Sequence, residues 1–258
     1  MTNATTPKIL VVDDDPAIRN LLHRFLGQKY HIQCAVDGKT ALETFEKFNP
    51  DLVILDWNLP DDNGYNLCKK MQSWLNVLVL ILTSRQDEAD KISILRAGAD
   101  DFMTKPFSLP LMEVRVEVLL RRAIHQPIKP TQRLVFNNLV IDPVRRAVTL
   151  NEQPVSLTPT EFDILHFLAT NPNQVWPRKE LIEKVWDCKN YVGELRVIDV
   201  HIGQIRKKIE IDVTQPKLIQ TVRRCGYKFE VPSTTRQKLN ASGEPGFGQN
   251  AVRYLSAS

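Results

Sequence analysis

Three apolar segments, each ending in polar side chains, constrain the fold of this 258-residue chain more than any other feature. They are KILVV (8–12), LVILD (52–56) and VLVLILTS (77–84), and segments with helical periodicity separate them. Short apolar strands that alternate with amphipathic helices are typical of a parallel sheet with helices on both faces. The first half of the chain is therefore predicted to be an α/β domain.

The remaining elements of this half follow the same order. After the first strand, Asp15 is suited to cap a helix that begins at Pro16 and ends before Gly27. Further strands and helices are predicted at 30–36, 40–48, 101–104 and 109–123. Five strand–helix units fit within residues 1–122, which predicts a doubly wound, five-stranded parallel sheet of the flavodoxin-like kind.

A second domain, α+β in class, is predicted after a linker at 123–132 that contains two prolines and no apolar periodicity. Strand-like runs in 133–158 predict a small antiparallel sheet. Thr158 and Glu161 form a capping-box pattern at the start of a helix. Two more helices and a hairpin are predicted at 178–186, 195–210 and 218–231. The domain is assigned to 133–232.

The apolar runs and the N-terminal sequence argue against a membrane protein and against a secreted protein. No apolar run reaches the roughly 18 to 20 residues needed to span a bilayer, and the N-terminus lacks a basic flank followed by an apolar core. The four scattered cysteines form no C-x-x-C pair, so they are expected to be small buried hydrophobes in a reducing cytosol. We therefore expect a cytoplasmic protein without membrane contact. Residues 233–258, rich in Ser, Gly, Asn and Thr, are predicted to be a disordered tail.

Charged and hydroxyl side chains cluster where the predicted parallel strands end. Asp13 and Asp14 follow the first strand, Asp56 ends the third, Thr83 lies at the end of the fourth, and Lys105 follows the fifth. Open parallel sheets bind ligands at this edge. Three carboxylates crowded there would raise one another's pKa unless a cation joins them, and oxygen ligands without histidine or cysteine suit Mg²⁺. The sequence therefore predicts a Mg²⁺ site.

A lysine and a hydroxyl beside such an ion form a site that can stabilise a phosphoryl group in transfer. Mg²⁺ and Lys105 would neutralise the phosphoryl oxygens, and Asp56 would act as the nucleophile and become an acyl phosphate. A hydrolase with an aspartyl-phosphate intermediate is the alternative from a different class. It would need a substrate pocket or cap and a second acid–base residue near Asp56, and the sequence indicates neither, so we expect no enzyme.

Four sequence blocks resemble the signature of bacterial response-regulator receiver domains: VVDDDPAIR, DLVILDWNLPDDNG, ILTS and AGADDFMTKPF. The resemblance spans about residues 7–122. It implies that Asp56 is the phosphoacceptor for a sensor histidine kinase, that Thr83 and Lys105 contact the phosphoryl group, and that the Lys105–Pro106 peptide is cis. It also implies a Mg²⁺ site formed by Asp13, Asp14, Asp56 and the backbone carbonyl of Asn58.

The same resemblance implies how the receiver signals. Thr83 and Phe102 correspond to the switch pair of the family, in which the hydroxyl moves toward the phosphoryl group and the ring turns inward. Taken alone, Phe102 also suits an ordinary core position. The face formed by the fourth helix, fifth strand and fifth helix mediates dimerisation in the family. Here the predicted homodimer face carries Lys91, Asp100, Asp101, Glu113, Arg115 and Arg122.

Positive charge concentrates in the second domain. Residues 196–228 hold eight basic and three acidic side chains, as expected of a surface that binds nucleic acid. In the helix at 195–210, a rotation of about 100° per residue gathers four isoleucines into a core stripe: Ile198, Ile202, Ile205 and Ile209. The opposite face then presents Arg196, Val200, Gly203 and Lys207, flanked by Gln204 and Arg206. A basic helix face alone also suits a solvated surface.

The second half resembles the winged-helix effector domain of OmpR/PhoB-type regulators over about residues 133–232. The resemblance is carried by LTPTEFDILHFLATNPNQVWPRKELIEKVW, RVIDVHIGQIRKKI and LIQTVRRCGYKFEV. It implies that the helix containing Arg196 enters the major groove and that Arg223 in the wing reaches the minor groove or its phosphates. Arg196, Arg206 and Lys207 would then bind phosphates, Val200 would meet a thymine methyl and Gln204 would read adenine. Arg224 adds a charge to the wing where relatives carry glycine.

These features predict a phosphorylation-dependent transcription regulator. With Mg²⁺ it would accept a phosphoryl group on Asp56, dimerise through the receiver, bind double-stranded promoter DNA and act on RNA polymerase. The alternative is a regulator that binds DNA regardless of phosphorylation and uses the receiver only for dimerisation. The complete set of pocket residues favours the phosphorylation-dependent form, because a degenerate receiver should have lost at least one.

Overall fold

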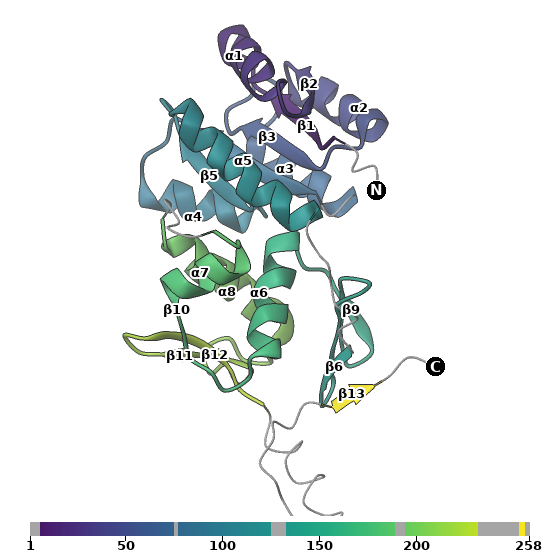
Figure 1. The fold of residues 1–258 in the computed structure, drawn as a ribbon, viewed down its shortest axis with the longest axis vertical. Helices are drawn as coiled ribbons and strands as arrows, with labels where there is room; N and C mark the ends of the chain where they lie inside the picture. Colours follow the sequence, from purple (N-terminus) through teal and green to yellow (C-terminus); the bar gives the residue numbers. More distant parts are fainter. Residues whose placement is uncertain (1–5, 75–76, 125–132, 189–193, 232–252, 256–258) are drawn as a thin grey trace, which may run out of the picture. The chain divides into compact units, whose positions relative to one another are not determined.

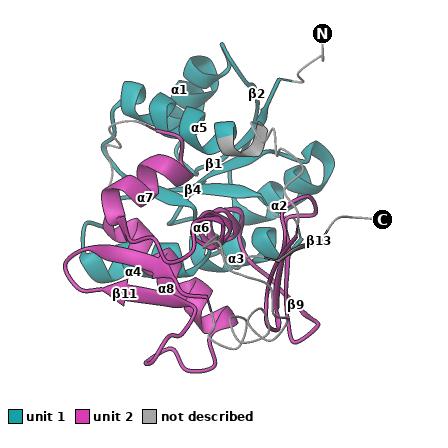
Figure 2. Cartoon of the chain, turned by 60° about the horizontal axis from the view of Figure 1, so that its bottom comes forward, with its two compact units in different colours: residues 1–126 teal, residues 127–258 magenta. Residues whose placement is uncertain are grey.

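A computed structural model of the chain describes residues 6–74, 77–124, 133–188, 194–231 and 253–255. The chain divides into two compact units, residues 1–126 and 127–258 (Figure 2), and the boundary between them falls within the predicted linker. Within the described residues, no helix combines the length and apolar character that a membrane span requires.

The first unit is built on a parallel sheet of five strands in the order β2-β1-β3-β4-β5 (Figure 1). The strands are β1 (Lys8–Val12), β2 (His31–Ala35), β3 (Leu52–Asp56), β4 (Leu78–Thr83) and β5 (Asp101–Thr104). The helices that alternate with them are α1 (Pro16–Leu26), α2 (Gly38–Phe48), α3 (Gly64–Trp74), α4 (Glu88–Arg96) and α5 (Leu109–Ile124). This is the predicted doubly wound α/β fold, and its strand order reverses between β1 and β3.

Helices cover both faces of this sheet. Alternate side chains of a strand point to opposite faces, so each central strand contributes to two apolar layers. One layer joins the sheet to α1 and α5 and includes Ile9, Val11, Leu22, Leu26, Ile54, Leu80, Met112 and Val116. Helices α2, α3 and α4 also bury apolar side chains, among them Phe45, Leu67, Met71 and Ile94. The strands are buried on both sides, which explains why their sequences are continuously apolar.

The predicted helix caps are confirmed. Asp15 accepts the backbone N–H of Ala17 at 2.8 Å, and Pro16 occupies the first turn of α1. In the second unit, Thr158 and Glu161 form the reciprocal bonds of a capping box at the start of α6 (Pro159–Thr170). Both caps satisfy N–H groups that the first helical turn leaves without intrahelical partners.

The second unit begins with an antiparallel sheet of β6 (Arg133–Phe136), β7 (Leu139–Asp142), β8 (Ala147–Leu150) and β9 (Gln153–Val155). A fifth strand, β13 (Arg253–Leu255), pairs antiparallel with the outer edge of β6. The prediction of a disordered tail is therefore wrong for these three residues, because the backbone groups of the β6 edge offer a pairing site that sequence composition does not reveal. Residues 232–252 and 256–258 lie outside the described residues.

Among the residues that the structure describes, three helices and a second sheet follow. Besides α6, the helices are α7 (Arg178–Val185) and α8 (Arg196–Ile209), and the sheet has the order β10-β12-β11. Its strands are β10 (Trp176–Pro177), β11 (Ile219–Val222) and β12 (Gly226–Phe229), of which the last two form the predicted hairpin. The isoleucine stripe of α8 is buried as predicted, with Ile198, Ile202 and Ile205 fully covered. This arrangement is a winged helix-turn-helix, which confirms the predicted fold class.

The four cysteines differ in environment. Only Cys68 is fully buried, while Cys34 and Cys225 are exposed and Cys188 is half-buried. The expectation of four buried cysteines is therefore wrong. Cys34 lies on the edge strand β2, and Cys225 lies in the loop between β11 and β12, so neither faces a core.

Candidate functional site

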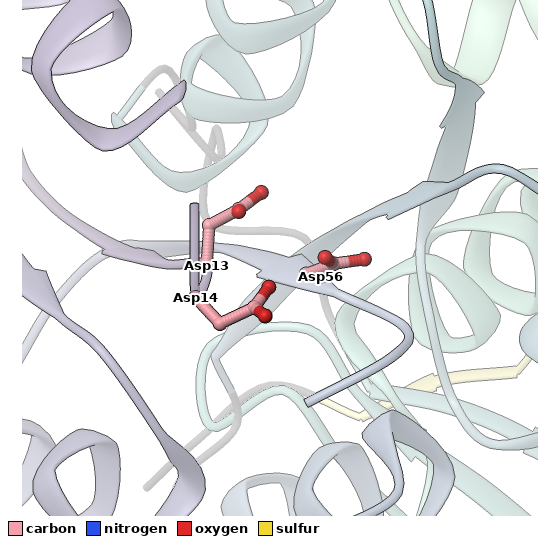
Figure 3. A group of neighbouring side chains, drawn as sticks. All are labelled: Asp13, Asp14 and Asp56. Carbon is pink, nitrogen blue, oxygen red and sulfur yellow. The ribbon is translucent and has the colours of Figure 1, made fainter. Parts of the chain in front are cut away.

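The acidic residues predicted to form a metal site come together in the first unit. Asp13 directly follows β1, and Asp56 is the last residue of β3, the neighbouring strand in the sheet. One carboxylate oxygen from each of Asp13, Asp14 and Asp56 lies within 4.8 Å of the others (Figure 3). Asp13 and Asp56 are buried, whereas Asp14 is exposed and leaves the cluster open to solvent.

Lys105 bridges the two buried carboxylates. Its ammonium donates to Asp13 Oδ2 at 2.7 Å and to Asp56 Oδ2 at 2.8 Å. The peptide between Lys105 and Pro106 is cis, as predicted. Burial alone would lower the pKa of Lys105, but its hydrogen bonds to the two aspartates raise that pKa above its ordinary value. The lysine therefore stays charged where a phosphoryl oxygen would need a counter-charge.

The carboxylate cluster has the donor set that a hard divalent cation prefers. Burial raises the pKa of Asp13, although Lys105 and the backbone N–H of Asp15 both donate to its carboxylate. The folded protein therefore disfavours negative charge at Asp13, and a cation would relieve this cost. Asp13, Asp14 and Asp56 supply oxygen atoms only, which fits Mg²⁺. The backbone N–H of Asn58 donates to Asp56 Oδ1 at 3.3 Å, so Asn58 lies beside the same carboxylate.

The connection from β3 to the first residue of α3 contains two residues that the sequence did not single out. A Cβ atom at Gly64 would lie 2.8 Å from Cα and O of Trp57, so only glycine fits this close crossing of the backbone. Asp61 accepts the N–H groups of Gly38 and Lys39 at 2.8 and 3.0 Å, which ties the loop to the start of α2. These hydrogen bonds hold the pKa of Asp61 below its ordinary value. An Asp-Asp-Asn-Gly turn was the available signal for both positions.

The predicted switch residues lie on neighbouring strands. Thr83 is the last residue of β4 and is fully buried, and its hydroxyl oxygen accepts the N–H of Arg85 at 3.0 Å. Phe102 lies on β5, where it pairs in register with Ile81. Its side chain is buried, with the Lys91 ammonium 5.8 Å from the ring centroid.

The predicted dimer face needs correction. Asp100 is fully buried and accepts the N–H of Val79 at 2.8 Å, so the prediction that it is a surface charge is wrong. Asp101 is also buried and forms an ion pair with Arg115. Both carboxylates satisfy groups inside the unit, a role that the charge pattern alone does not distinguish from surface exposure. Glu113 pairs with Lys29, and the side chain of Arg122 lies outside the described part of the chain.

In the second unit, α8 presents a polar face opposite its isoleucine stripe. Arg196 and Lys207 are exposed, and Val200, Gly203 and Gln204 are half-buried. Arg223 and Arg224 are exposed in the three-residue loop that joins β11 to β12. The residues predicted to touch DNA therefore lie on one helix face and on the tip of the adjacent hairpin, with Arg206 as the exception.

Arg206 joins α8 to the hairpin. Its Nη2 donates to the carbonyl of Ile219 at 2.7 Å and to the hydroxyl of Thr221 at 2.9 Å, and its guanidinium lies 5.6 Å from the ring centroid of Tyr227. Burial lowers the pKa of Arg206 below its usual value. The structure thus gives this arginine a role in positioning the wing, which the sequence did not predict.

A second connection involves Asp199, Arg178 and Tyr227. Asp199 Oδ1 accepts two hydrogen bonds, one from Nε–H of Arg178 and one from the hydroxyl of Tyr227, each with a donor–acceptor distance of 2.6 Å. Burial, followed by the hydrogen bond to Asp199, raises the pKa of Tyr227 to about 12. Residues from α7, α8 and β12 therefore meet at one carboxylate. No local pattern predicts this network, because Arg178 and Tyr227 lie 21 and 28 positions from Asp199 in the sequence.

Comparisons with known proteins agree with both units. Residues 9–117 match the family described as response regulator receiver domain, and residues 152–229 match the family described as transcriptional regulatory protein, C terminal. The chain is 37% identical to transcriptional regulatory protein TrcR of Mycobacterium tuberculosis over 87% of each chain. It is 38% identical to transcriptional regulatory protein ResD of Bacillus subtilis over 89% of this chain and 98% of that one. A solved structure of a RitR mutant shares the fold, with a TM-score of 0.71, 24% identity and coverage of 88% and 100%.

Proposed function

This chain belongs to the OmpR/PhoB-type two-component response regulators, and on that premise we propose that phosphorylation of Asp56 by a sensor histidine kinase controls its binding to promoter DNA. It combines a receiver domain with a DNA-binding domain, and its relatives are transcriptional regulators. The observation that supports the proposal most directly is Lys105, which bridges Asp13 and Asp56 in a cluster of three carboxylates.

In the proposed reaction, a carboxylate oxygen of Asp56 attacks the phosphorus of a phosphohistidine. The new O–P bond forms as the P–N bond breaks, and the leaving imidazole keeps the electron pair of that bond. Lys105, 2.8 Å from Asp56 Oδ2, would neutralise one phosphoryl oxygen, and Thr83 at the end of the next strand would bind another. Asp13, Asp14, Asp56 and the Asn58 carbonyl would hold Mg²⁺, which would offset the charge of the incoming group.

The phosphoryl group is proposed to act as a signal rather than as a step toward a released product, so we do not propose an enzyme. The Thr83 hydroxyl, which accepts the N–H of Arg85 in the structure, would turn toward the phosphoryl group. The Phe102 ring would then pack into the space beside it. Because α4, β5 and α5 adjoin this pair, we propose that their shared face forms a homodimer. The charged residues that we propose for this dimer face are Lys91, Glu113 and Arg115. Asp100 and Asp101 are excluded from it because their side chains are buried.

Dimerisation would bring two winged helices to adjacent half-sites on double-stranded DNA. We propose that α8 enters the major groove, with Arg196 and Lys207 on phosphates and with Val200 and Gln204 on base edges. Arg223 and Arg224 at the exposed hairpin tip would contact the minor groove or its phosphates. A regulator placed in this way in the cytoplasm would act on RNA polymerase at the promoter.

The test compares DNA binding and oligomeric state of the wild-type chain and of Asp56→Ala. Each is measured with and without Mg²⁺ plus acetyl phosphate or beryllofluoride, by fluorescence anisotropy and light scattering. We expect the donor to strengthen dimerisation and DNA affinity in the wild type alone. If a phosphorylated wild-type sample stays monomeric at micromolar concentration, the proposed dimer is wrong.

A different result would favour the alternative function. If wild type and Asp56→Ala bind DNA equally well under all these conditions, the receiver does not control the output. The chain would then be a regulator that binds DNA regardless of phosphorylation, with the first unit serving only to assemble the dimer.

A further inference from the structure

Gly203 lies at the centre of the polar face of α8. Arg196, Val200 and Lys207 share this face, and the buried isoleucines lie on the opposite side of the helix. Glycine is among the least favourable residues in a helix interior, because it loses more backbone freedom on folding than alanine does. A glycine in the middle of a fourteen-residue helix therefore calls for a specific reason.

The fold of the second unit does not supply that reason. A Cβ atom built at Gly203 meets no other atom within 4 Å. Gly203 also lies within the regular α-helix, whose backbone conformation an L-amino acid adopts without strain. Gly64 in the first unit shows the contrast, because a Cβ atom there would lie 2.8 Å from the backbone of Trp57. Alanine at position 203 is thus compatible with every contact inside the protein.

Nor does the structure use Gly203 as a hinge. One turn before it, Asp199 binds Arg178 and Tyr227. One turn after it, Arg206 binds Ile219 and Thr221. On the other flank of the helix, Lys208 forms an ion pair with Glu161 of α6. Because α8 is anchored on both sides of the glycine, bending at this point would break contacts that hold the helix and wing together.

We propose that Gly203 is a specificity-determining residue at which the bare backbone of α8 makes its closest approach to DNA. Glycine is used where a backbone must come near a ligand, and here the missing side chain lets the helix sit deeper in the major groove. The added depth brings Val200 and Gln204, which flank Gly203 on the same surface, within reach of base edges such as a thymine methyl and an adenine. This inference rests on the proposed DNA-binding function.

The test uses the full chain with Mg²⁺ and acetyl phosphate, because the proposed DNA binding depends on phosphorylation, and a duplex that the wild-type protein selects from a random-sequence library under these conditions. Gly203→Ala and Gly203→Leu are compared with wild type for binding to this duplex and to a scrambled duplex of the same composition. We expect the affinity for the selected duplex to fall about tenfold for alanine and about a hundredfold or more for leucine. Affinity for the scrambled duplex should change by less than about twofold, because phosphate contacts dominate non-specific binding.

Thermal unfolding provides the second measurement. We expect Gly203→Ala to raise the Tm of the DNA-binding unit by about 4 to 8 °C, since a better helix former replaces glycine without a clash. Lys207→Ala, one turn along the same face, serves as the matched control and should weaken binding to both duplexes alike. A rise in stability together with a loss of selective binding would support the proposal.

Three results would overturn it. If Gly203→Leu binds the selected duplex as tightly as wild type, the helix does not approach DNA at this point. If alanine and leucine reduce binding equally, the loss reflects backbone flexibility rather than steric distance. If the wild-type chain selects no duplex at all, the DNA-binding function itself is wrong, and this inference fails with it.

Discussion

Arg178 at the start of α7 and Asp199 in the first turn of α8 are joined by a hydrogen-bonded ion pair, with Nε 2.6 Å from Oδ1. The same carboxylate oxygen accepts the hydroxyl of Tyr227 from β12. A single side chain therefore fixes the positions of two helices and the wing relative to one another. This network can therefore determine how the residues that we propose to contact DNA are presented.

Substitution of Asp199 should disturb this alignment. Asp199→Ala removes both hydrogen bonds, and because the ion pair is about one third exposed we expect a loss of only about 1 kcal/mol in the free energy of unfolding. DNA affinity should fall on every sequence, since the helix and wing lose their common anchor. Urea unfolding and anisotropy titrations measure the two effects. Asp199→Asn keeps the acceptor oxygen and should lose less than half as much affinity; equal losses would show that charge, not alignment, matters.

Tyr227 should make the stability of the second unit sensitive to alkaline pH. Burial and the bond to Asp199 raise its pKa from the ordinary value of 10.0 to about 12, so the folded state favours the neutral phenol. This contribution is complete below pH 10 and is lost as the pH rises from about 10 to about 12. Burial also raises the pKa of Tyr30, so absorbance titration of tyrosinate is compared between wild type, Tyr227→Phe and Tyr30→Phe. The step near pH 12 should be present in wild type and in Tyr30→Phe and absent from Tyr227→Phe; if Tyr227→Phe keeps this step, another tyrosine is responsible.

Mg²⁺ should stabilise the first unit through the carboxylate cluster. At ten times the dissociation constant, ligand binding to the folded state adds about 1.4 kcal/mol to the free energy of unfolding. Asp13→Asn should abolish this gain, and without Mg²⁺ it should be more stable than wild type at pH 7, because the raised pKa of Asp13 shows that folding disfavours its charge. Thermal shift measurements with Mg²⁺ or a chelator check both effects. Asp15→Asn is the control. In the wild type the Asp15 carboxylate caps α1, so this variant should keep the stabilisation by Mg²⁺.

Arg224 adopts a left-handed backbone conformation, with φ of 62°. This region costs a residue with a Cβ atom about 1 to 2 kcal/mol, whereas glycine adopts it freely. Arg224→Gly should therefore stabilise the second unit by about 1 kcal/mol in urea unfolding. Arg223→Gly is the matched control, since it removes the same charge from the neighbouring position and should not stabilise the unit. If Arg224 contacts a phosphate, its loss should also flatten the salt dependence of DNA binding by about one unit of slope.

The sequence was sufficient to predict the pocket but not the partners of many charged residues. Asp13, Asp56 and Lys105 could be brought together in advance because parallel strands place their carboxyl ends at one edge of the sheet. Asp100 and Asp101 follow the same turn and look alike in sequence. Each is buried because it satisfies a specific neighbour, the N–H of Val79 or the guanidinium of Arg115. Such pairing depends on tertiary packing, which local patterns do not contain.

The same limit applies to the second unit. The isoleucine period of α8 correctly predicts which face of the helix is buried. It does not show that Arg206 turns toward Ile219 and Thr221, because that choice depends on how closely the hairpin approaches the helix. The pairing of β13 with β6 is hidden for a similar reason, since more than a hundred residues separate the two strands.

The uneven exposure of the cysteines makes the natural sequence suitable for fluorescence labelling. Cys34 in the first unit and Cys225 at the wing are exposed, whereas Cys68 is buried and burial further raises its pKa, which keeps it unreactive. Replacement of the half-buried Cys188 by serine would leave one accessible thiol in each unit. A donor dye and an acceptor dye on these two thiols would then form a molecular ruler, and energy transfer between them would test whether the wing moves relative to the receiver when a phosphoryl donor is added.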